Sequence, residues 1–298
     1  LLLSAVYITA CNTPSNEEQQ LVAVDNPPLG EFPAHALAKS LPIPDSLTFA
    51  GESVPLHIPD VKERLDRELH INTYWHNNTI FLIKHAHRWL PQMEPILKEY
   101  GIPDDFKYLT AIEGSFRNDQ SPAGAVGFWQ FRKVTAKEFG LEVTREVDER
   151  YDPIKSTIAA CKYLNRAYNK FGNWTNVAGS YNRGMAGLQR AMTHQKDSVY
   201  YNLMLNEETS RYVFRILAIK EIIEHPVKYN FNIDEQHLYN EEEVRYVEVS
   251  SSINDLVQWS RDNGINYKLL KRHNPWLQKD KLTVRGGKVY QIAIPIVK

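Results

Sequence analysis

The sequence predicts a mainly α-helical body followed by a small α+β domain. Apolar residues recur with helical spacing through residues 61–100, and segments typical of strands lie near the C-terminal end, at 244–249 and 287–295. The composition is that of a globular protein, with 43% hydrophobic and 24% charged residues among 298. Since 35 basic side chains nearly balance 36 acidic ones, a nucleic-acid partner is not expected.

The first eleven residues are expected to be the end of a signal peptide. Residues 1–10 form an apolar run that is too short to cross a membrane, and neither an initiator Met nor a basic stretch precedes it, so we expect the sequence to begin inside the signal. Residues 8–11, Ile-Thr-Ala-Cys, resemble the lipobox of bacterial lipoproteins, in which Cys11 would become the acylated N-terminus. An ordinary cleaved signal with an incidental cysteine is the alternative.

A proline-rich tether is expected at residues 12–59. Half of the sixteen prolines fall there, and its first half has no basic side chain, so it should bury too little apolar surface to fold alone. The helical body, with an N-terminal extension, is expected to span 60–233. The polar residues 234–243 are expected to link it to a C-terminal domain at 244–298.

Neither a metal nor a cofactor is expected. The sequence has no HExxH, no CxxC, no aspartate-rich calcium loop, no phosphate-binding glycine loop and no nucleophile elbow. His85 and His87 are two positions apart, so on a helix they point away from each other. Cys161 lies in a helical pattern and is expected to be a buried apolar residue.

The candidate catalytic group is a glutamate on an apolar helix face. A helix is expected to begin at 102–105, where a proline and two acidic residues suit the positive end of the helix dipole. Phe106, Leu109 and Glu113 follow on one face. Because burial disfavours an ionised carboxylate, the pKa of Glu113 should rise, as a general acid near neutral pH requires. A glutamate at a helix end that is either solvated or paired with Arg117 is the alternative.

An irregular, glycine-rich loop follows this helix. Three glycines fall within residues 114–127, and 121–127 is expected to form a tight turn. Phe-Trp-Gln-Phe at 128–131 then places aromatic rings close to a side-chain amide. An acid beside aromatic rings and one amide donor is typical of a sugar-binding cleft.

These segments resemble four motifs of the family 1 lytic transglycosylases, whose SLT domains are similar to goose-type lysozyme and cleave peptidoglycan. In the family's order they are Glu-Gly-Ser-Phe at 113–116, Ser-Pro-Ala-Gly-Ala-Val-Gly-Phe-Trp-Gln at 121–130, Ala-Gly-Ser-Tyr-Asn-Arg-Gly at 178–184 and Asn-Glu-Glu-Thr-Ser-Arg-Tyr-Val at 206–213. Between the second and third, a helix is expected to open at Asp152-Pro153 and to run to Gly172. The resemblance covers about 95–230 and implies a lysozyme-like helical domain.

The resemblance implies a role for six residues. Glu113 corresponds to the catalytic acid, and the positions expected to bind the substrate are Ser121, Gln130, Tyr181, Asn182 and Tyr212. Trp129, as part of the aromatic wall, is also expected to contact the substrate. The family usually has a serine directly after the catalytic glutamate. Gly114 stands there in this sequence, which removes one hydroxyl near the acid.

The resemblance also implies cleavage without water. Ordinary glycosidases use two carboxylates. In this family a single glutamate protonates the oxygen between MurNAc and GlcNAc and then takes the proton of the MurNAc 6-hydroxyl, which attacks C1 and leaves a 1,6-anhydro sugar. Two alternatives stay open. One is a hydrolytic muramidase with a second carboxylate such as Asp119, since Asp148 lies in a charged run and Asp152 caps a helix; the other is a non-catalytic scaffold that binds the cell wall.

The C-terminal segment is expected to have the order βααβ. The strands are expected at 244–249 and 287–295, and the two helices at 254–263 and 267–272. This order, with Leu-x4-Asn-Pro and a terminal Ile-Pro, resembles a LysM domain and implies binding to GlcNAc-containing glycans. The usual Gly-Asp-Thr-Leu is replaced by Ser-Ile-Asn-Asp-Leu at 252–256, so a purely structural cap is the alternative. Taken together, we expect a monomeric peptidoglycan enzyme that is lipid-anchored to the outer membrane and faces the periplasm.

Overall fold

The structure, a computed structural model, describes residues 39–296. The predicted signal segment, Cys11 and residues 12–38 of the predicted tether lie outside these residues. Of the described residues, 41–296 form one compact unit. None of the helices in the described part is long and apolar enough to cross a membrane.

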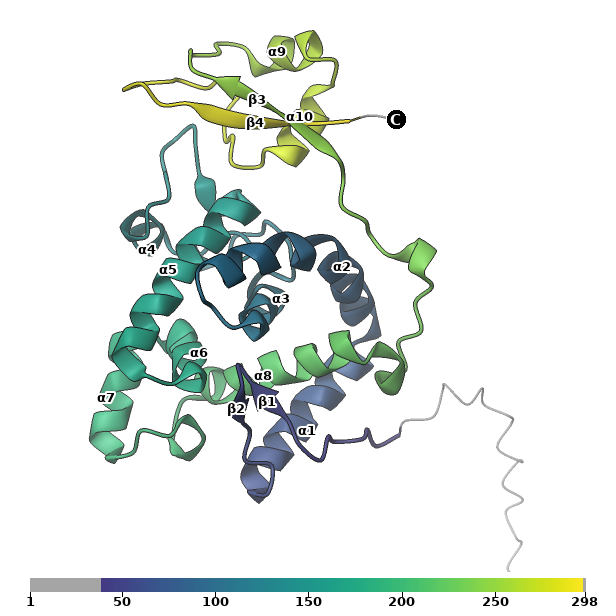
Figure 1. Cartoon of the computed structure of the whole chain (residues 1–298), viewed down its shortest axis with the longest axis vertical. Coiled ribbons are helices and arrows are strands. Elements are labelled where there is room, and N and C mark those ends of the chain that lie inside the picture. Colours follow the sequence, from purple (N-terminus) through teal and green to yellow (C-terminus); the bar gives the residue numbers. More distant parts are fainter. Residues whose placement is uncertain (1–38, 297–298) are drawn as a thin grey trace, which may run out of the picture. The chain divides into compact units, whose positions relative to one another are not determined.

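Helices build the body of this unit (Figure 1). In chain order they are α1 (Pro59–Tyr74), α2 (His76–Glu99), α3 (Leu109–Gly114), α4 (Lys133–Glu138), α5 (Pro153–Phe171), α6 (Trp174–Arg183), α7 (Met185–Gln195) and α8 (Glu207–Glu224). The short helix α3 lies inside the body, with α2, α5 and α8 around it (Figure 1). Because Leu109 and Thr110 of α3 are completely buried, the residues at its end are held in a fixed place.

Capping residues set the limits of α5 and α6. Asp152 accepts hydrogen bonds of 3.0 Å from two backbone amides in the first turn of α5, where Pro153 is the first residue. Gly172 ends α5 with φ of 64°. Asn173 then caps α6 by accepting a 2.9 Å hydrogen bond from Asn176 N. The predicted limits of α5 are confirmed.

The segment before α3 differs from the predicted continuous helix. Asp104–Tyr108 forms a 3-10 turn, η2, and the α-helix begins only at Leu109. Lys107 Nζ donates a 2.6 Å hydrogen bond to Asp104 Oδ2 across this turn, which favours the tighter winding. Residues three apart align in a 3-10 turn, so Phe106 and Leu109 still share the buried side.

The folded body begins before residue 60, and the predicted tether is wrong for residues 41–58. The strands β1 (Thr48–Phe49) and β2 (Glu52–Ser53) pair there as a small antiparallel hairpin. Phe49 is completely buried, with its ring centroid 5.2 Å from that of Phe106. A few well-placed apolar side chains thus anchor a segment whose proline-rich composition favoured a tether.

Two carboxylates fix this hairpin to the helices. Glu52 accepts hydrogen bonds of 2.6 and 2.9 Å from the first backbone amides of α6 and so adds a second cap to that helix. Asp105 accepts 2.7 Å hydrogen bonds from Ala50 N and from Lys220 Nζ of α8. The hairpin therefore contributes to the placement of both α6 and α8.

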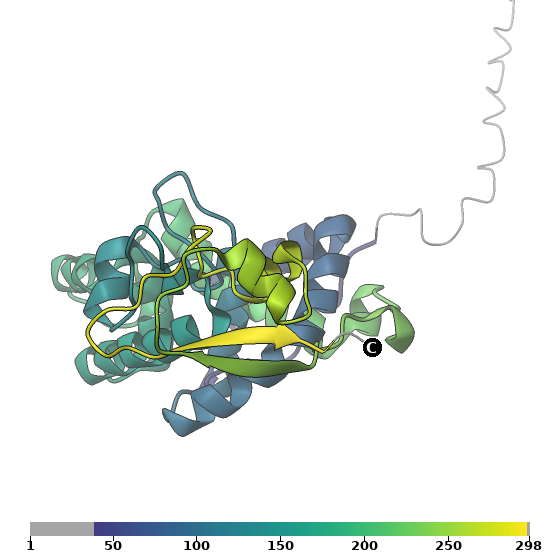
Figure 2. The same cartoon turned by 90° about the horizontal axis from the view of Figure 1, so that it is seen from above.

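The C-terminal residues form a βααβ domain, which confirms the predicted fold class. Its elements are β3 (Val244–Val249), α9 (Leu256–Asp262), α10 (Tyr267–His273) and β4 (Tyr290–Pro295). The two strands lie side by side and pair antiparallel along their whole length (Figure 2). Asn274 is buried and links α10 to β4, because its amide donates to Ala293 O at 2.7 Å and its oxygen accepts from Ala293 N at 2.8 Å.

The loop between α4 and α5 is bonded to this C-terminal domain. Asp148 N donates to Trp276 O at 2.9 Å, and Gln278 N donates to Glu146 O at 2.8 Å. Val147 is 2% exposed and belongs to the apolar core of the C-terminal domain. This loop therefore depends on the C-terminal domain for its burial.

Candidate active site

Glu113 lies in the last turn of α3 and faces α8. Its side chain is half-buried, and the hydroxyl of Tyr212 donates a 2.6 Å hydrogen bond to Glu113 Oε1. Burial raises the pKa of Glu113, and the negative charge of Glu208 adds to this shift. The hydrogen bond from Tyr212 and the charge of Arg215 act in the opposite direction without cancelling it. The carboxyl group therefore keeps its proton to a higher pH than an ordinary glutamate.

Two tyrosines face this carboxyl group from different helices. Burial, with the charge of Glu113, raises the pKa of both Tyr212 on α8 and Tyr181 on α6 well above the ordinary value. Both hydroxyls therefore stay protonated. Tyr212 can donate its hydrogen bond whenever Glu113 is ionised, whereas the Tyr181 hydroxyl donates to Trp129 O at 2.7 Å.

Glu113 lines a cleft of about 600 Å³. The residues around it are Glu113, Ser121, Pro122, Ala123, Ala125, Gln130, Phe131, Arg132, Thr135, Tyr163, Tyr181, Asn182, Arg183, Gly184 and Glu208. The fold thus brings five of the predicted site residues together in one cleft: Glu113, Ser121, Gln130, Tyr181 and Asn182.

The polar groups of the cleft also hold one another. Ser121 Oγ accepts a 3.0 Å hydrogen bond from Ala125 N, and Gln130 Nε2 donates to Gly127 O at 2.8 Å. These bonds fix the shape of the loop that forms one wall. On the opposite wall, Asn182 Nδ2 donates to Glu208 Oε1 at 3.0 Å, which links α6 to the first turn of α8.

Arg150 holds the loop on the side away from the cleft, a role that none of the sequence motifs indicates. Its guanidinium donates to Gly124 O at 3.0 Å and to Phe131 O at 3.1 Å, while Asp148 accepts two hydrogen bonds of 2.9 and 2.7 Å from it. A Cβ at Gly127, whose φ is 78°, would lie 2.1 Å from Arg150 O, so only glycine fits. The run Asp-Glu-Arg at 148–150 was the available signal, but its spacing alone does not show which acid the arginine meets.

Two of the predicted substrate-binding residues are buried. Trp129 is completely buried, and its Nε1 donates a 2.8 Å hydrogen bond to Thr157 Oγ1 in the core. Tyr212 is 1% exposed, and its hydroxyl is used by Glu113. Neither ring is exposed in the cleft, so their burial favours roles other than the predicted contact with the substrate. Trp129 supports the fold, and Tyr212 acts on the acid.

The second carboxylates considered from sequence do not lie in the cleft. Asp119 is exposed and lies 3.1 Å from Arg117 Nε, while Asp148 pairs with Arg150 and Asp152 caps α5. Glu208 is the second carboxylate in the cleft wall, and sequence reasoning missed it. It lies four residues before Tyr212 on α8, a spacing that places both on one face of a helix.

Two family models match the chain. Residues 96–204 match the transglycosylase SLT domain, and residues 245–298 match the soluble lytic transglycosylase C-terminal LysM-like domain. The chain carries an SLT domain. The predicted resemblance to lytic transglycosylases and to a LysM-like domain is thereby confirmed. The SLT match contains Glu113 and most of the cleft wall, whereas Glu208 and Tyr212 lie on α8, beyond the matched residues.

The similarity to one kind of lytic transglycosylase extends over nearly the whole chain. Membrane-bound lytic murein transglycosylase D of Escherichia coli is 25% identical over 306 residues, which cover 96% of this chain and 66% of that protein. The chain thus spans about two thirds of the length of these relatives. Among solved structures, an inactive mutant of the lytic transglycosylase Slt from Pseudomonas aeruginosa is 18% identical, with a TM-score of 0.36, over 51% of this chain and 26% of that one. A likeness at this TM-score does not bear on the site.

Histidines and acids do not gather into a metal centre in the part of the chain that the structure describes. No group of three or more His, Cys, Asp or Glu side chains within residues 39–296 could hold a metal ion.

Proposed function

We propose that this protein is a peptidoglycan lytic transglycosylase, with Glu113 acting first as acid and then as base. The observation that carries this proposal is the half-buried carboxyl of Glu113, with its raised pKa, in the wall of the SLT cleft. Because the raised pKa keeps this carboxyl protonated to a higher pH than an ordinary glutamate, the group can give its proton to a leaving oxygen. The substrate would be the glycan strand, cut between MurNAc and GlcNAc.

The proton returns to the same carboxyl group in this mechanism. Glu113 protonates the bridging oxygen, the C1–O bond breaks, and an oxocarbenium-like centre develops on the MurNAc ring. The MurNAc 6-hydroxyl attacks C1, its proton passes to the Glu113 carboxylate, and the product is 1,6-anhydroMurNAc. Because the nucleophile is part of the same sugar, it has a high effective molarity and no water has to be positioned.

Tyr212 has a defined part in this cycle. Between the two proton transfers Glu113 is an ionised carboxylate in a poorly solvated place. The Tyr212 hydroxyl, 2.6 Å from Oε1, donates to it and offsets part of the cost of that charge. Four residues of the cleft are proposed to contact the sugar: Ser121, Gln130, Tyr181 and Asn182. Their existing hydrogen bonds within the protein restrict which of their polar atoms can bind it.

Hydrolysis is the alternative that a specific observation favours. Glu208 lies in the cleft wall, so it is the carboxylate that could activate a water. Its side chain accepts from Asn182 and adds to the raised pKa of Glu113, which also suits a purely electrostatic role. The product separates the two cases, because the anhydro sugar is one water lighter than the hydrolysed one.

The test of the enzymatic function is a pair of isosteric variants. Glu113→Gln should lower the release of soluble fragments from purified wall by at least about a hundredfold, since the general acid is lost. Glu208→Gln should retain most of the activity. If Glu113→Gln digests the wall like the wild type, the protein is not an enzyme of this kind, and persistent wall binding without fragments would favour the scaffold.

We also propose a place for the protein at the cell envelope. The relatives are named membrane-bound, and Ile-Thr-Ala-Cys at 8–11 suits a lipid anchor at Cys11, although these residues lie outside those described. The proposed order along the chain is a lipid anchor, a tether and the catalytic body, which begins near residue 41. The LysM-like domain follows and is proposed to retain the protein on glycan. Cys11→Ser should move the protein from the membrane fraction to the soluble fraction.

A further inference from the structure

The first turn of α8 and the two residues directly after it, Arg211 and Tyr212, carry three contacts of the candidate active site. Tyr212 bonds to Glu113, Glu208 lines the cleft, and Thr209 Oγ1 donates to Asn182 Oδ1 at 2.7 Å. Yet this helix end has no side-chain cap, since Asn206 at the capping position makes no such hydrogen bond. The position of this turn must therefore come from contacts at its side.

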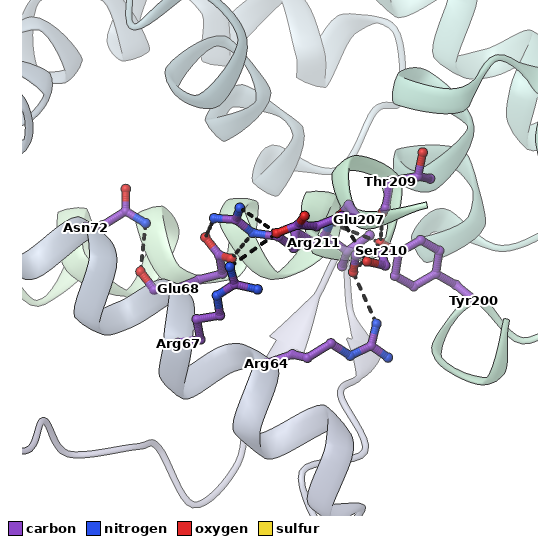
Figure 3. A network of polar contacts seen from close by, with 10 residues as sticks. Arg64, Arg67, Glu68, Asn72, Tyr200, Glu207, Thr209, Ser210 and Arg211 are labelled. Carbon is purple, nitrogen blue, oxygen red and sulfur yellow. Dashed lines mark hydrogen bonds and ion pairs between the residues drawn. The ribbon is translucent and has the colours of Figure 1, made fainter. Parts of the chain in front are cut away.

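An ion pair between the buried Glu68 and the partly exposed Arg211 supplies the main lateral contact (Figure 3). Glu68 of α1 is 1% exposed, and its two carboxylate oxygens accept from Arg211 Nε at 2.5 Å and from Arg211 Nη2 at 3.2 Å. This fork geometry fixes both the distance and the rotation of the arginine. Arg211 directly precedes Tyr212 in the chain, so a displacement of one carries the other with it.

Two more donors hold the backbone of the same turn. Arg64 of α1 donates to Ser210 O at 3.2 Å, and the buried hydroxyl of Tyr200 donates to Thr209 O (Figure 3). The turn is thus bonded from α1 on one side and from the segment before α8 on the other. Helix α1 lies outside the matched SLT residues, so the support comes from the N-terminal extension.

We propose that Glu68 and Arg211 are positioning residues of the active site, which fix the first turn of α8 so that the Tyr212 hydroxyl reaches Glu113. Such an ion pair contributes little net stability against an apolar replacement, because desolvation of the buried Glu68 carboxylate offsets the attraction between the charges. Its directional bonds, in contrast, set where the turn lies. The inference rests on the proposed function, since it assigns a role in the same cleft.

The test is the pH profile of wall digestion by Glu68→Gln. The hydrogen bond from Tyr212 lowers the pKa of Glu113, so its loss raises that pKa and moves the alkaline limb of the profile to higher pH. We expect Glu68→Gln to move the limb in the same direction as Tyr212→Phe and to lower kcat by ~10- to 100-fold, with KM little changed. The double variant should move the limb no further than Tyr212→Phe alone, since both changes remove one interaction. Arg211→Lys keeps the charge of the ion pair, so this variant should lose less kcat than Glu68→Gln does.

Asp105→Asn is the matched control. It breaks the 2.7 Å pair between Asp105 and Lys220, which anchors α8 nine residues further along, and should lower the melting temperature without moving the limb. The inference is overturned if Glu68→Gln loses stability like this control but keeps the wild-type profile. If the wild type releases no fragments at all, the proposed function fails instead; the carboxyl pKa of Glu113, followed by NMR in wild type and Glu68→Gln, then decides the inference by itself.

Discussion

A Cβ atom on Gly114 would lie 2.8 Å from the carbonyl oxygen of Gly127 and 2.9 Å from the Cα of Phe128. Both contacts are with backbone, so neither can be relieved by a change of rotamer. The residue after the acid is therefore glycine in this chain because the loop of the cleft packs directly on the end of α3. The family's usual serine has no room here.

Gly114→Ser should for this reason impair the protein, although it restores the usual family residue. The loop must move away from α3, which disturbs Glu113 and the cleft wall together. We expect a loss of kcat/KM on the order of tenfold or more and a lower melting temperature. Gly187→Ala on α7 is the control, because its Cβ would meet only the flexible side chain of Arg183, and its melting temperature should change little. A fully active Gly114→Ser protein would show that the loop packs differently.

Trp129→Phe should act on stability rather than on substrate binding. The indole is completely buried and donates to Thr157 Oγ1, so the smaller ring leaves a void and removes that hydrogen bond, while Thr157 still donates to Pro153 O. From the void and the lost indole hydrogen bond we expect a loss of about 1–3 kcal/mol in the free energy of unfolding, measured by denaturant titration, with KM unchanged for the folded protein. A raised KM at unchanged stability would instead place this residue at the substrate.

Glu208→Gln should move the alkaline limb of the activity profile to lower pH. The charge of Glu208 contributes to the raised pKa of Glu113, so its removal lets Glu113 ionise at a lower pH. The shift is opposite in sign to that of Tyr212→Phe, and the two variants can be compared in one set of buffers. A limb that stays in place would mean that solvent screens Glu208 from the acid.

The stability of Glu113→Gln should depend on pH in a defined way. The pKa of Glu113 is raised above its ordinary value of 4.5, so the folded protein binds this proton more tightly than the unfolded chain. The contribution of this protonated carboxyl to the wild-type free energy of unfolding is complete below about pH 4.5, and it falls as the pH rises through the pKa of the folded state. The glutamine variant carries no such charge, so its melting temperature should exceed that of the wild type above this window and approach it at acid pH.

Removal of residues 244–298 should disturb the cleft as well as retention on the wall. Without these residues, Val147 in the loop between α4 and α5 becomes exposed, and the hydrogen bond from Asp148 N to Trp276 O is lost. Asp148 in turn holds the Arg150 guanidinium, which fixes the cleft loop. We expect lower activity on soluble glycan fragments, where retention does not matter. A truncated protein with full activity on such fragments would show that the body keeps this loop without help.

The helical pattern, caps and motif order predicted the large features of this fold. Asp152, Pro153 and Gly172 set the limits of α5 through local chemistry that is legible in the sequence. The burial of Phe49 was not legible, because its partner Phe106 is distant in the chain and the surrounding prolines favoured a tether. Capping and spacing patterns predict contacts between residues close in sequence, whereas the fold of the segment around Phe49 depends on packing against residues far along the chain.

The sequence predicted most of the residues that line the cleft, but it predicted the role of each residue less well. The motifs placed Ser121, Gln130 and Tyr181 in the same cleft as Glu113. They could not tell that Trp129 faces inward, since an aromatic residue next to a cleft and one beneath it have the same local sequence. They also did not indicate the ion pair between Glu68 and Arg211, which joins helices far apart in the chain.

The mass of the fragments released from purified peptidoglycan tests the central claim most directly. The account predicts that the wild-type protein releases disaccharide peptides that end in 1,6-anhydroMurNAc, one water lighter than the muramidase products, and that Glu113→Gln releases none. Fragments that carry the mass of the added water would contradict it and would assign the reaction to hydrolysis with a second carboxylate.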